Sequence, residues 1–143
     1  MALPKHLKLE FVTPAQAIAH EEVDEVELPG EEGYFGVLPG HAPLLAALST
    51  GIMWYRKGTE KHYAFVDGGF AEVLPTRVSI LAQTAERAED IDLARAEAAK
   101  LRAEELLTTK MTSTVDFDAE RARIAMLRAI ARIQVSRQTR PRS

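Results

Sequence analysis

The spacing of apolar residues changes once along this chain, near Gln83, and that change limits the folds open to it. From Leu7 to about Gln83, apolar residues come in short runs separated by Gly, Pro and Asp, a spacing typical of an all-β sandwich or barrel. From Asp92 the chain is rich in strong helix formers and contains no Gly. The sequence therefore predicts an α+β chain: residues 1–86 form a sandwich or barrel of about eight to ten strands, and residues 87–143 form a helical hairpin.

Two turns are expected in the β-rich part. Residues 51–56 and 61–66 read as strands flanking residues 57–60, Lys-Gly-Thr-Glu. An Asp-Gly pair at 67–68 then separates 61–66 from the apolar residues 70–74. Asp-Gly is a strong signal for a tight hairpin turn, because both central residues need positive φ angles, which Gly accepts and Asp tolerates. We therefore expect a second chain reversal at residues 67–68.

Two helices are expected at about residues 92–108 and 117–136. Asp92 can accept hydrogen bonds from the free amides at the start of the first helix, and Ile91 can pack on Ala96; such a cap is typically worth about 1 kcal/mol. The connecting loop is short, so the two helices should lie antiparallel.

The packing between these helices is predicted to be weak. Their facing positions are dominated by alanine, and at roughly 25 cal/mol per Å² of apolar surface such a seam contributes only a few kcal/mol. The hairpin could therefore open or rearrange. The alternative is a hairpin that stays permanently docked.

Composition excludes several classes of function. The chain has no cysteine and four scattered histidines, so a disulfide framework, a thiolate zinc site and a thiol nucleophile are ruled out. No Ser nucleophile or orienting acid accompanies His41, so no catalytic residue is predicted. The acidic residues between Glu21 and Glu32 fit a solvated or partner-facing edge better than a cation site. We expect neither an enzyme nor a metal protein.

Membrane and secretion signals are also missing from the sequence. No apolar run approaches the roughly 20 residues that a membrane span requires. The start of the chain lacks the apolar stretch of a secretion signal, and no lipidation motif is found. The prediction is a soluble protein located in the cytoplasm.

Charge differs between the two parts of the chain. Residues 1–89 hold 7 Lys or Arg against 13 Asp or Glu, whereas residues 90–143 hold 11 against 8. After Glu120 the remaining residues contain seven arginines and no acid. This segment suits an acidic partner, and Arg121, Arg128 and Arg132 could jointly meet a carboxylate-rich surface or a phosphate.

Three stretches together resemble the epsilon subunit of bacterial F-type ATP synthases. Residues 33–45 match the family pattern G-x-x-G-V-L-x-x-H-x-P-L, and residues 68–73 read Gly-Gly-Phe-Ala-Glu-Val. Residues 91–96 match the I-D-x-x-R-A segment with which many bacterial members bind ATP. The resemblance covers almost the whole chain.

The resemblance implies a non-catalytic rotor subunit, peripheral to the cytoplasmic face of the inner (plasma) membrane. Its β-sandwich would bind the gamma subunit and the ring of c subunits. Its helical hairpin would either fold on the sandwich or extend along gamma into the alpha/beta catalytic hexamer and inhibit ATP hydrolysis.

The resemblance also implies ATP as a regulatory ligand that stabilises the folded hairpin. Arginines from both helices would neutralise phosphates that neither helix could hold alone, while an acid accepts hydrogen bonds from adenine or ribose. The residues at the matching positions are Glu86, Ile91, Asp92, Arg95, Ala96, Arg102, Arg128 and Arg132.

Two other classes of function remain as alternatives. One is a free-standing ATP-binding sensor. The other is a nucleic-acid-binding adaptor, suggested by the arginines, but the acidic first part, a pI near 5.8 and the scarcity of aromatic residues near the arginines argue against it. We expect no nucleic-acid partner.

Overall fold

The computed structural model describes residues 3–110 and 119–138, and the chain divides into two compact units. The first unit, Met1–Arg87, is built of strands, and the second, Ala88–Ser143, contains the helices. The elements in chain order are β1 (Leu7–Val12), β2 (Ala17–Val23), β3 (Glu25–Gly30), β4 (Gly33–Val37), β5 (Leu44–Lys57), β6 (Glu60–Leu74), β7 (Arg77–Arg87), the 3-10 turn η1 (Ala88–Asp90), α1 (Leu93–Lys110) and α2 (Ala119–Arg137).

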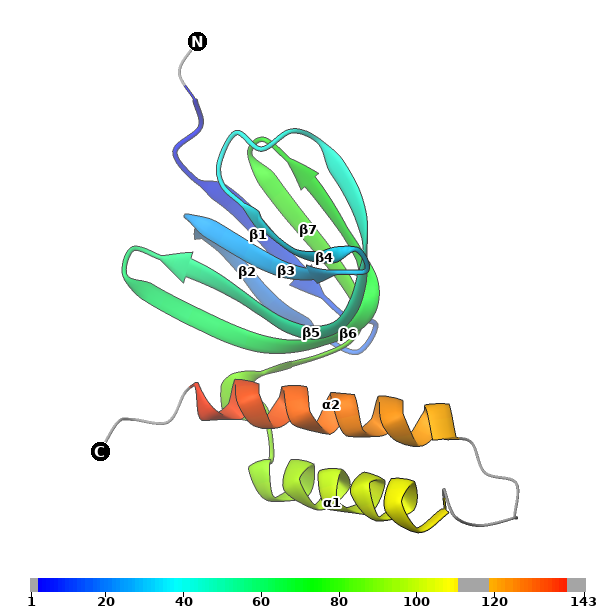
Figure 1. Cartoon of the computed structure of the whole chain (residues 1–143). Coiled ribbons are helices and arrows are strands. Elements are labelled where there is room, and N and C mark those ends of the chain that lie inside the picture. The colour runs from blue at the N-terminus through cyan, green and yellow to red at the C-terminus, as the bar shows by residue number, and fades with distance from the viewer. Residues whose placement is uncertain (1–2, 111–118, 139–143) are drawn as a thin grey trace. The chain divides into compact units, whose positions relative to one another are not determined.

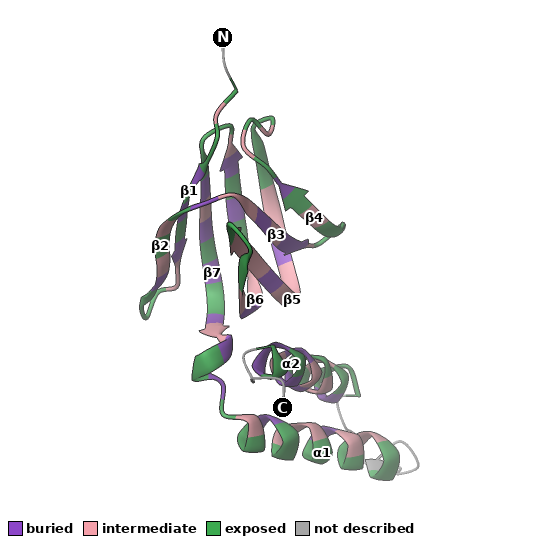
Figure 2. Ribbon diagram, turned by 90° about the vertical axis from the view of Figure 1, so that its left-hand side faces the viewer, coloured by how far each residue is buried: buried purple, intermediate pink, exposed green. Residues whose placement is uncertain are grey.

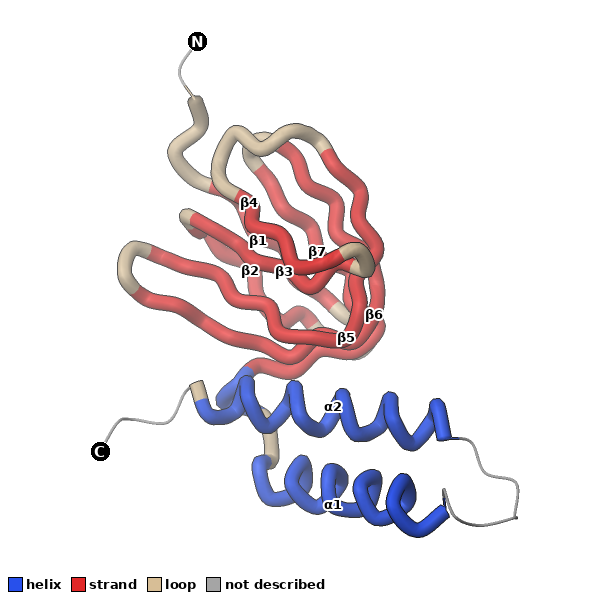
Figure 3. The backbone as a smooth tube through the Cα atoms, in the orientation of Figure 1, coloured by secondary structure: helices blue, strands red, loops and turns tan. Residues whose placement is uncertain are grey.

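The β unit is a single seven-stranded sheet with the order β2-β1-β7-β6-β5-β3-β4. Neighbouring strands are antiparallel except for β1 and β7, which are parallel. The two longest strands, β5 and β6, have 14 and 15 residues, and they bend so that the sheet folds over on itself (Figures 1 and 3). The predicted β-sandwich is confirmed, but it has seven strands instead of eight to ten.

The core of the β unit follows from the alternation of apolar and polar residues along its strands. Leu7, Leu9 and Phe11 of β1 are fully buried, and so are Val78 and Ile80 of the neighbouring β7. The residues between them point outward, which gives the banded pattern along β7 in Figure 2. Alternate side chains point to opposite faces of a strand, so one face of each strand forms the core.

The turn predicted at residues 57–60 is confirmed, whereas the turn predicted at 67–68 is wrong. Lys57 pairs with Glu60 across a hairpin in which Gly58 has a φ of 61°. At Asp67 the chain does not reverse, and β6 pairs with both β5 and β7 on either side of this point without a shift of register.

The difference at residues 67–68 has a physical cause. Gly68 and Gly69 do take positive φ angles, of 75° and 115°, but they use them to bend a strand. A Cβ atom on Gly69 would lie 2.7 Å from the Cα of Ala82 in β7, so this position must be glycine for the two strands to approach. The Asp-Gly signal correctly indicates the backbone conformation, but the partner strands on both sides decide how it is used.

The helical unit begins with the predicted cap. The backbone N–H of Arg95 donates to Asp92 Oδ1 at 3.1 Å, and α1 starts at Leu93. Ile91 and Ala96 are both buried, as the predicted staple requires. The predicted start of the second helix at 117 lies outside the described residues, which resume at Ala119 as part of α2.

Alanines dominate the seam between α1 and α2, which pack together as antiparallel helices (Figures 1 and 3). Ala96 and Ala103 of α1 and Ala122 and Ala129 of α2 are buried. Ile133 of α2 is also buried, whereas Leu101 of α1 is 56% exposed. In the described part of the chain, no helix combines the length and apolar character needed to cross a bilayer.

Candidate functional site

The residues predicted to bind ATP are divided between the two units. Glu86 lies near the end of β7 and is half-buried. The other seven belong to the helical unit: Ile91 and Asp92 precede α1, Arg95, Ala96 and Arg102 lie in α1, and Arg128 and Arg132 lie in α2.

Three of these residues have structural roles in the helical unit. The Asp92 carboxylate accepts the capping hydrogen bond from the Arg95 amide. Ile91 is buried, and Ala96 has no exposed surface. These three positions therefore fix where α1 begins.

The four arginines predicted to bind ATP, Arg95, Arg102, Arg128 and Arg132, share one side of the hairpin. Each of them lies two positions along the chain from a residue that lines the groove between the helices. On α1, Arg95 precedes Glu97 by two positions and Arg102 precedes Glu104 by two. On α2, Arg128 and Arg132 lie two positions before and after Ile130. Two residues correspond to about 200° of rotation on an α-helix, so all four arginines lie on the side opposite that groove. The fold thus gathers cations from both helices on one side, the arrangement that phosphate binding requires.

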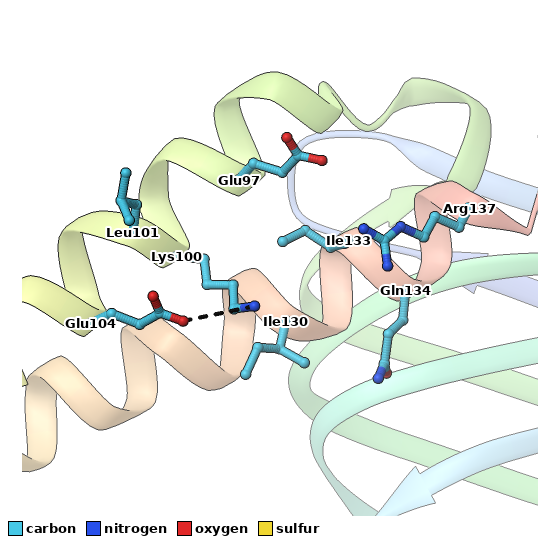
Figure 4. A pocket seen from close by; sticks show the side chains of 8 residues that line it. All are labelled: Glu97, Lys100, Leu101, Glu104, Ile130, Ile133, Gln134 and Arg137. Carbon is cyan, nitrogen blue, oxygen red and sulfur yellow. Dashed lines mark ion pairs between the residues drawn. The ribbon is translucent and has the colours of Figure 1, made fainter.

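A groove of about 440 Å³ between the helices contains none of the predicted residues. A salt bridge of 3.7 Å joins Lys100 and Glu104 on the α1 side of this groove (Figure 4). The residues that line it are Glu97, Lys100, Leu101, Glu104, Ile130, Ile133, Gln134 and Arg137.

Sequence reasoning did not single out this groove, although its signal was present. Its α1 residues recur at spacings of three and four, as do its α2 residues, and such spacings place side chains on one helix face. Arg102 lies elsewhere, in a shallower hollow on α1 with Glu105, Leu106 and Thr109.

Two exposed apolar surfaces lie on the β unit. The first contains Phe70 and Leu81, which are cross-strand neighbours on β6 and β7 and are 56% and 60% exposed. They line a hollow of about 380 Å³ that also includes Val12 and Pro14. We call this the Phe70 surface; the outward positions of its two large side chains follow from the alternation along β6 and β7.

The second surface has an acidic rim. Tyr34, Leu44 and Leu45 are exposed and line a hollow of about 390 Å³ together with Glu31 and Glu32. We call this the Leu45 surface. Half of the residues that line it belong to the stretch 33–45 that carries the family pattern.

Several other acidic residues of the β unit are paired with basic groups. Glu21 accepts hydrogen bonds from Lys57 Nζ at 2.8 Å and from the Tyr55 hydroxyl at 2.6 Å, and these bonds hold the pKa of the Glu21 carboxyl below its usual value. Glu25 forms a 3.1 Å ion pair with Arg56. The backbone N–H of Gly58, followed by His6, lowers the pKa of Asp24.

The paired carboxylates of Glu21, Asp24 and Glu25 therefore stabilise the fold more than they offer ligands to a metal ion. Across residues 3–110 and 119–138, no group of three or more His, Asp or Glu side chains has an arrangement that could hold a metal ion. Half-buried carboxylates paired with Lys and Arg are already charge-compensated.

Comparison with known proteins matches the two units to two domains of one and the same protein chain. The β-sandwich domain of the ATP synthase delta/epsilon chain matches residues 6–88, and the long α-helix domain of the same chain matches residues 89–137. The chain is 49% identical over 133 residues to the ATP synthase epsilon chain of Nitratidesulfovibrio vulgaris (strain DP4), which covers 93% of this chain and 97% of the relative. It is 47% identical over 137 residues to that of Herpetosiphon aurantiacus, covering 95% and 98%.

A solved structure agrees with these relatives. The cryo-EM structure of the Euglena gracilis mitochondrial ATP synthase, OSCP/F1/c-ring in rotational state 1, contains a chain that matches with a TM-score of 0.78 and 25% identity, covering 92% of this chain and 81% of that one. The resemblance found in residues 33–45, 68–73 and 91–96 is thereby confirmed. The chain belongs to the family of ATP synthase delta and epsilon chains, as a non-catalytic subunit of the bacterial epsilon type.

Proposed function

We propose that this chain is the epsilon subunit of the ATP synthase central stalk and that its β unit joins the stalk to the c-ring. The Phe70 surface and the Leu45 surface support this role, because exposed apolar patches on a folded domain mark protein contacts. Two such surfaces suit two partners, the gamma subunit and the c-ring. The subunit would then lie at the cytoplasmic face of the plasma membrane, held there by the complex.

The helical unit is the regulatory part of this proposal. The observation that carries it is the alanine seam, which leaves two well-formed helices with little buried apolar area between them. Such a pair can separate at modest cost in free energy. When extended along gamma, the helices bring the arginines of α2 to the acidic surfaces of the alpha/beta hexamer and inhibit ATP hydrolysis.

ATP is the proposed ligand of the folded hairpin, bound on the arginine side. A nucleotide that binds only the folded form stabilises it by about 2.7 kcal/mol at a hundredfold excess over Kd. That is comparable to the few kcal/mol expected from the seam. ATP would therefore favour the folded, non-inhibitory state.

Hydrolysis by the assembled complex tests the inhibitory role. A chain ending at Arg87 keeps the entire β unit. We expect it to bind gamma as the full chain does and to give a higher rate of ATP hydrolysis. An unchanged rate with normal binding would remove the inhibitory role while leaving the stalk role intact.

Calorimetry with ATP and Mg²⁺ tests the ligand. Arg128→Ala should weaken binding at least about tenfold, a loss of about 1.4 kcal/mol. Arg123→Ala is the matched control, because Arg123 lies on the same helix, is not one of the predicted site residues and pairs with Glu120. Equal affinities for the two variants would exclude the proposed site.

Substitutions on the β unit separate its two partners. Phe70→Glu and Leu45→Glu each place a charge in one apolar surface without touching the core. Each variant should lose binding to one partner, gamma or the c-ring, and keep the other. Normal binding of both partners by both variants would show that these surfaces are not the docking sites.

A further inference from the structure

The groove side of the helical unit carries an apolar strip that the hairpin itself does not cover. Leu101 of α1 is 56% exposed and Ile130 of α2 is half-buried, while the buried Ile133 lies beneath them in the groove floor. Leu127 is 55% exposed and lies one turn from Ile130, on the same flank of α2. A continuous strip of large apolar side chains across two helices is a surface suited to packing against further helices.

The two walls of the groove carry opposite charge. On the α1 wall the charges of Lys100 and Glu104 offset each other in a salt bridge, so the negative charge of Glu97 remains. On the α2 wall the charged residue is Arg137. Among the described residues, neither Glu97 nor Arg137 has an ion-pair partner within 4.0 Å. The α1 wall is thus net negative and the α2 wall net positive.

We propose that two copies of the free subunit associate through this strip to form an antiparallel four-helix bundle. A two-fold axis parallel to the helices places α1 of each copy against α2 of the other. Every helix then has antiparallel neighbours, as in up-and-down bundles. The same operation stacks the two apolar strips and brings each negative wall to a positive one.

The positions of the charges along the helices fit this arrangement. Glu97 and Arg137 line the same groove, in which the start of α1 lies beside the end of α2 (Figure 4). A two-fold axis parallel to the helices leaves heights along the helices unchanged. Glu97 of one copy therefore faces Arg137 of the other, and the bundle contains this ion pair twice. The alternative two-fold, perpendicular to the helices, would place like walls together.

The size of the surface sets the strength of the contact. A helix of 18 residues is about 27 Å long, and two helices packed at about 9 Å present a face on the order of 500 Å². Two copies would bury roughly 1,000 Å², the lower limit for a specific interface. The dimer is therefore weak and forms only at high concentration of free subunit.

This contact goes beyond the role proposed for the assembled complex. The groove exists only while α1 and α2 are paired, so self-association holds the free subunit in its folded-hairpin state. It uses the side opposite the four arginines and is therefore compatible with ATP binding. The fraction of free subunits with a folded hairpin would therefore rise with the concentration of the free chain.

Sedimentation of the full chain between about 5 and about 500 µM, a range that covers weak association, tests the proposal. The sedimentation coefficient should rise with concentration toward that of a dimer. Leu101→Glu should raise the dimer Kd at least about tenfold. Leu106→Glu is the matched control: it introduces the same charge at an exposed leucine of α1 that does not line the groove, and it should leave the Kd unchanged.

A charge exchange identifies the geometry. Glu97→Arg and Arg137→Glu alone should each weaken the dimer, and the double variant should recover it, because the pair is restored with reversed polarity. Circular dichroism checks that each variant keeps its helices. A wild type that stays monomeric throughout, equal effects of Leu101→Glu and Leu106→Glu, or no recovery in the double variant would each overturn the proposal. None of these outcomes bears on inhibition or ATP binding, which are measured separately.

Discussion

Gly69 is the residue at which β6 can bend and still pair on both sides. Its φ of 115° is one that L side chains rarely adopt, and the backbone of Leu81 and Ala82 occupies the space where a Cβ would be. Strain of this kind costs on the order of 1–3 kcal/mol before the steric clash is added.

Gly69→Ala should therefore be among the most destabilising single changes in the β unit, lowering the free energy of unfolding by more than about 3 kcal/mol. Gly36→Ala on β4 is the control, because a Cβ there meets nothing within 4 Å and its φ is not positive. Urea unfolding followed by fluorescence measures both. A small effect of Gly69→Ala would show that the strands can separate there without cost.

The Glu21 carboxylate gives the β unit a pH-dependent contribution. Its pKa is held down by Lys57 and then by Tyr55, so the folded state binds its proton less readily than the unfolded chain does. The stabilisation is present above the unfolded pKa and is lost as the pH falls through the lower, folded value.

Glu21→Gln should lower stability at neutral pH, and its difference from wild type should shrink as the pH drops below about 4.5. Glu72→Gln is the control, because Glu72 is exposed on β6 and has no ion pair in the described part of the chain. The free energy of unfolding of each variant, measured from pH about 3 to about 7, tests this pH dependence. A constant difference across that range would mean that the ion pair contributes nothing.

At the scale of elements, the first turn of α1 fixes where this helix begins. Its seam is made of alanine, so the hydrogen bond from the Arg95 amide to Asp92 is a large part of what fixes its start. Asp92→Ala should cost about 1 kcal/mol of helix stability, and Asp92→Asn should recover most of it, because asparagine also caps.

Thermal melting of the helical signal in the full chain measures this effect. A recovery by Asn identifies the cap, because an amide oxygen accepts the same hydrogen bond without the charge. If Asp92→Ala and Asp92→Asn melted together below wild type, the carboxylate charge would be the important feature instead.

Local signals and long-range pairing disagree in one element, β6. Asp67 and Gly68 carry the sequence of a hairpin turn, and Gly68 does take a positive φ. The register of β6 against both β5 and β7 continues through this point, so hydrogen bonds on two sides keep the strand extended. A preference of one dipeptide cannot reverse a strand that is paired on both edges.

At the scale of the whole molecule, the β unit has a core of its own. All residues of the main hydrophobic cluster lie between Leu7 and Ala85. The boundary at Arg87 therefore separates a part that carries most of the buried apolar area from a part that carries little.

A chain of residues 1–87 should fold alone and unfold cooperatively. Trp54, the single tryptophan, lies in β5 and reports on this unit directly. Its fluorescence should follow one sigmoidal transition in urea, as expected for a two-state domain of this size. A gradual change without a transition would show that the β unit depends on the helical residues.

The sequence by itself determined the two-part division, the outward and inward faces of the strands, the cap at Asp92 and the family. These are local properties, because periodicity, capping and motif spacing each depend on residues that are close together in the sequence. The tertiary structure alone decided that Gly68 and Gly69 bend a strand, that Phe70 and Leu81 form one exposed pair, and that Glu97 and Arg137 share a groove. Each of these depends on which distant residues become neighbours, and that follows only when strands and helices pack.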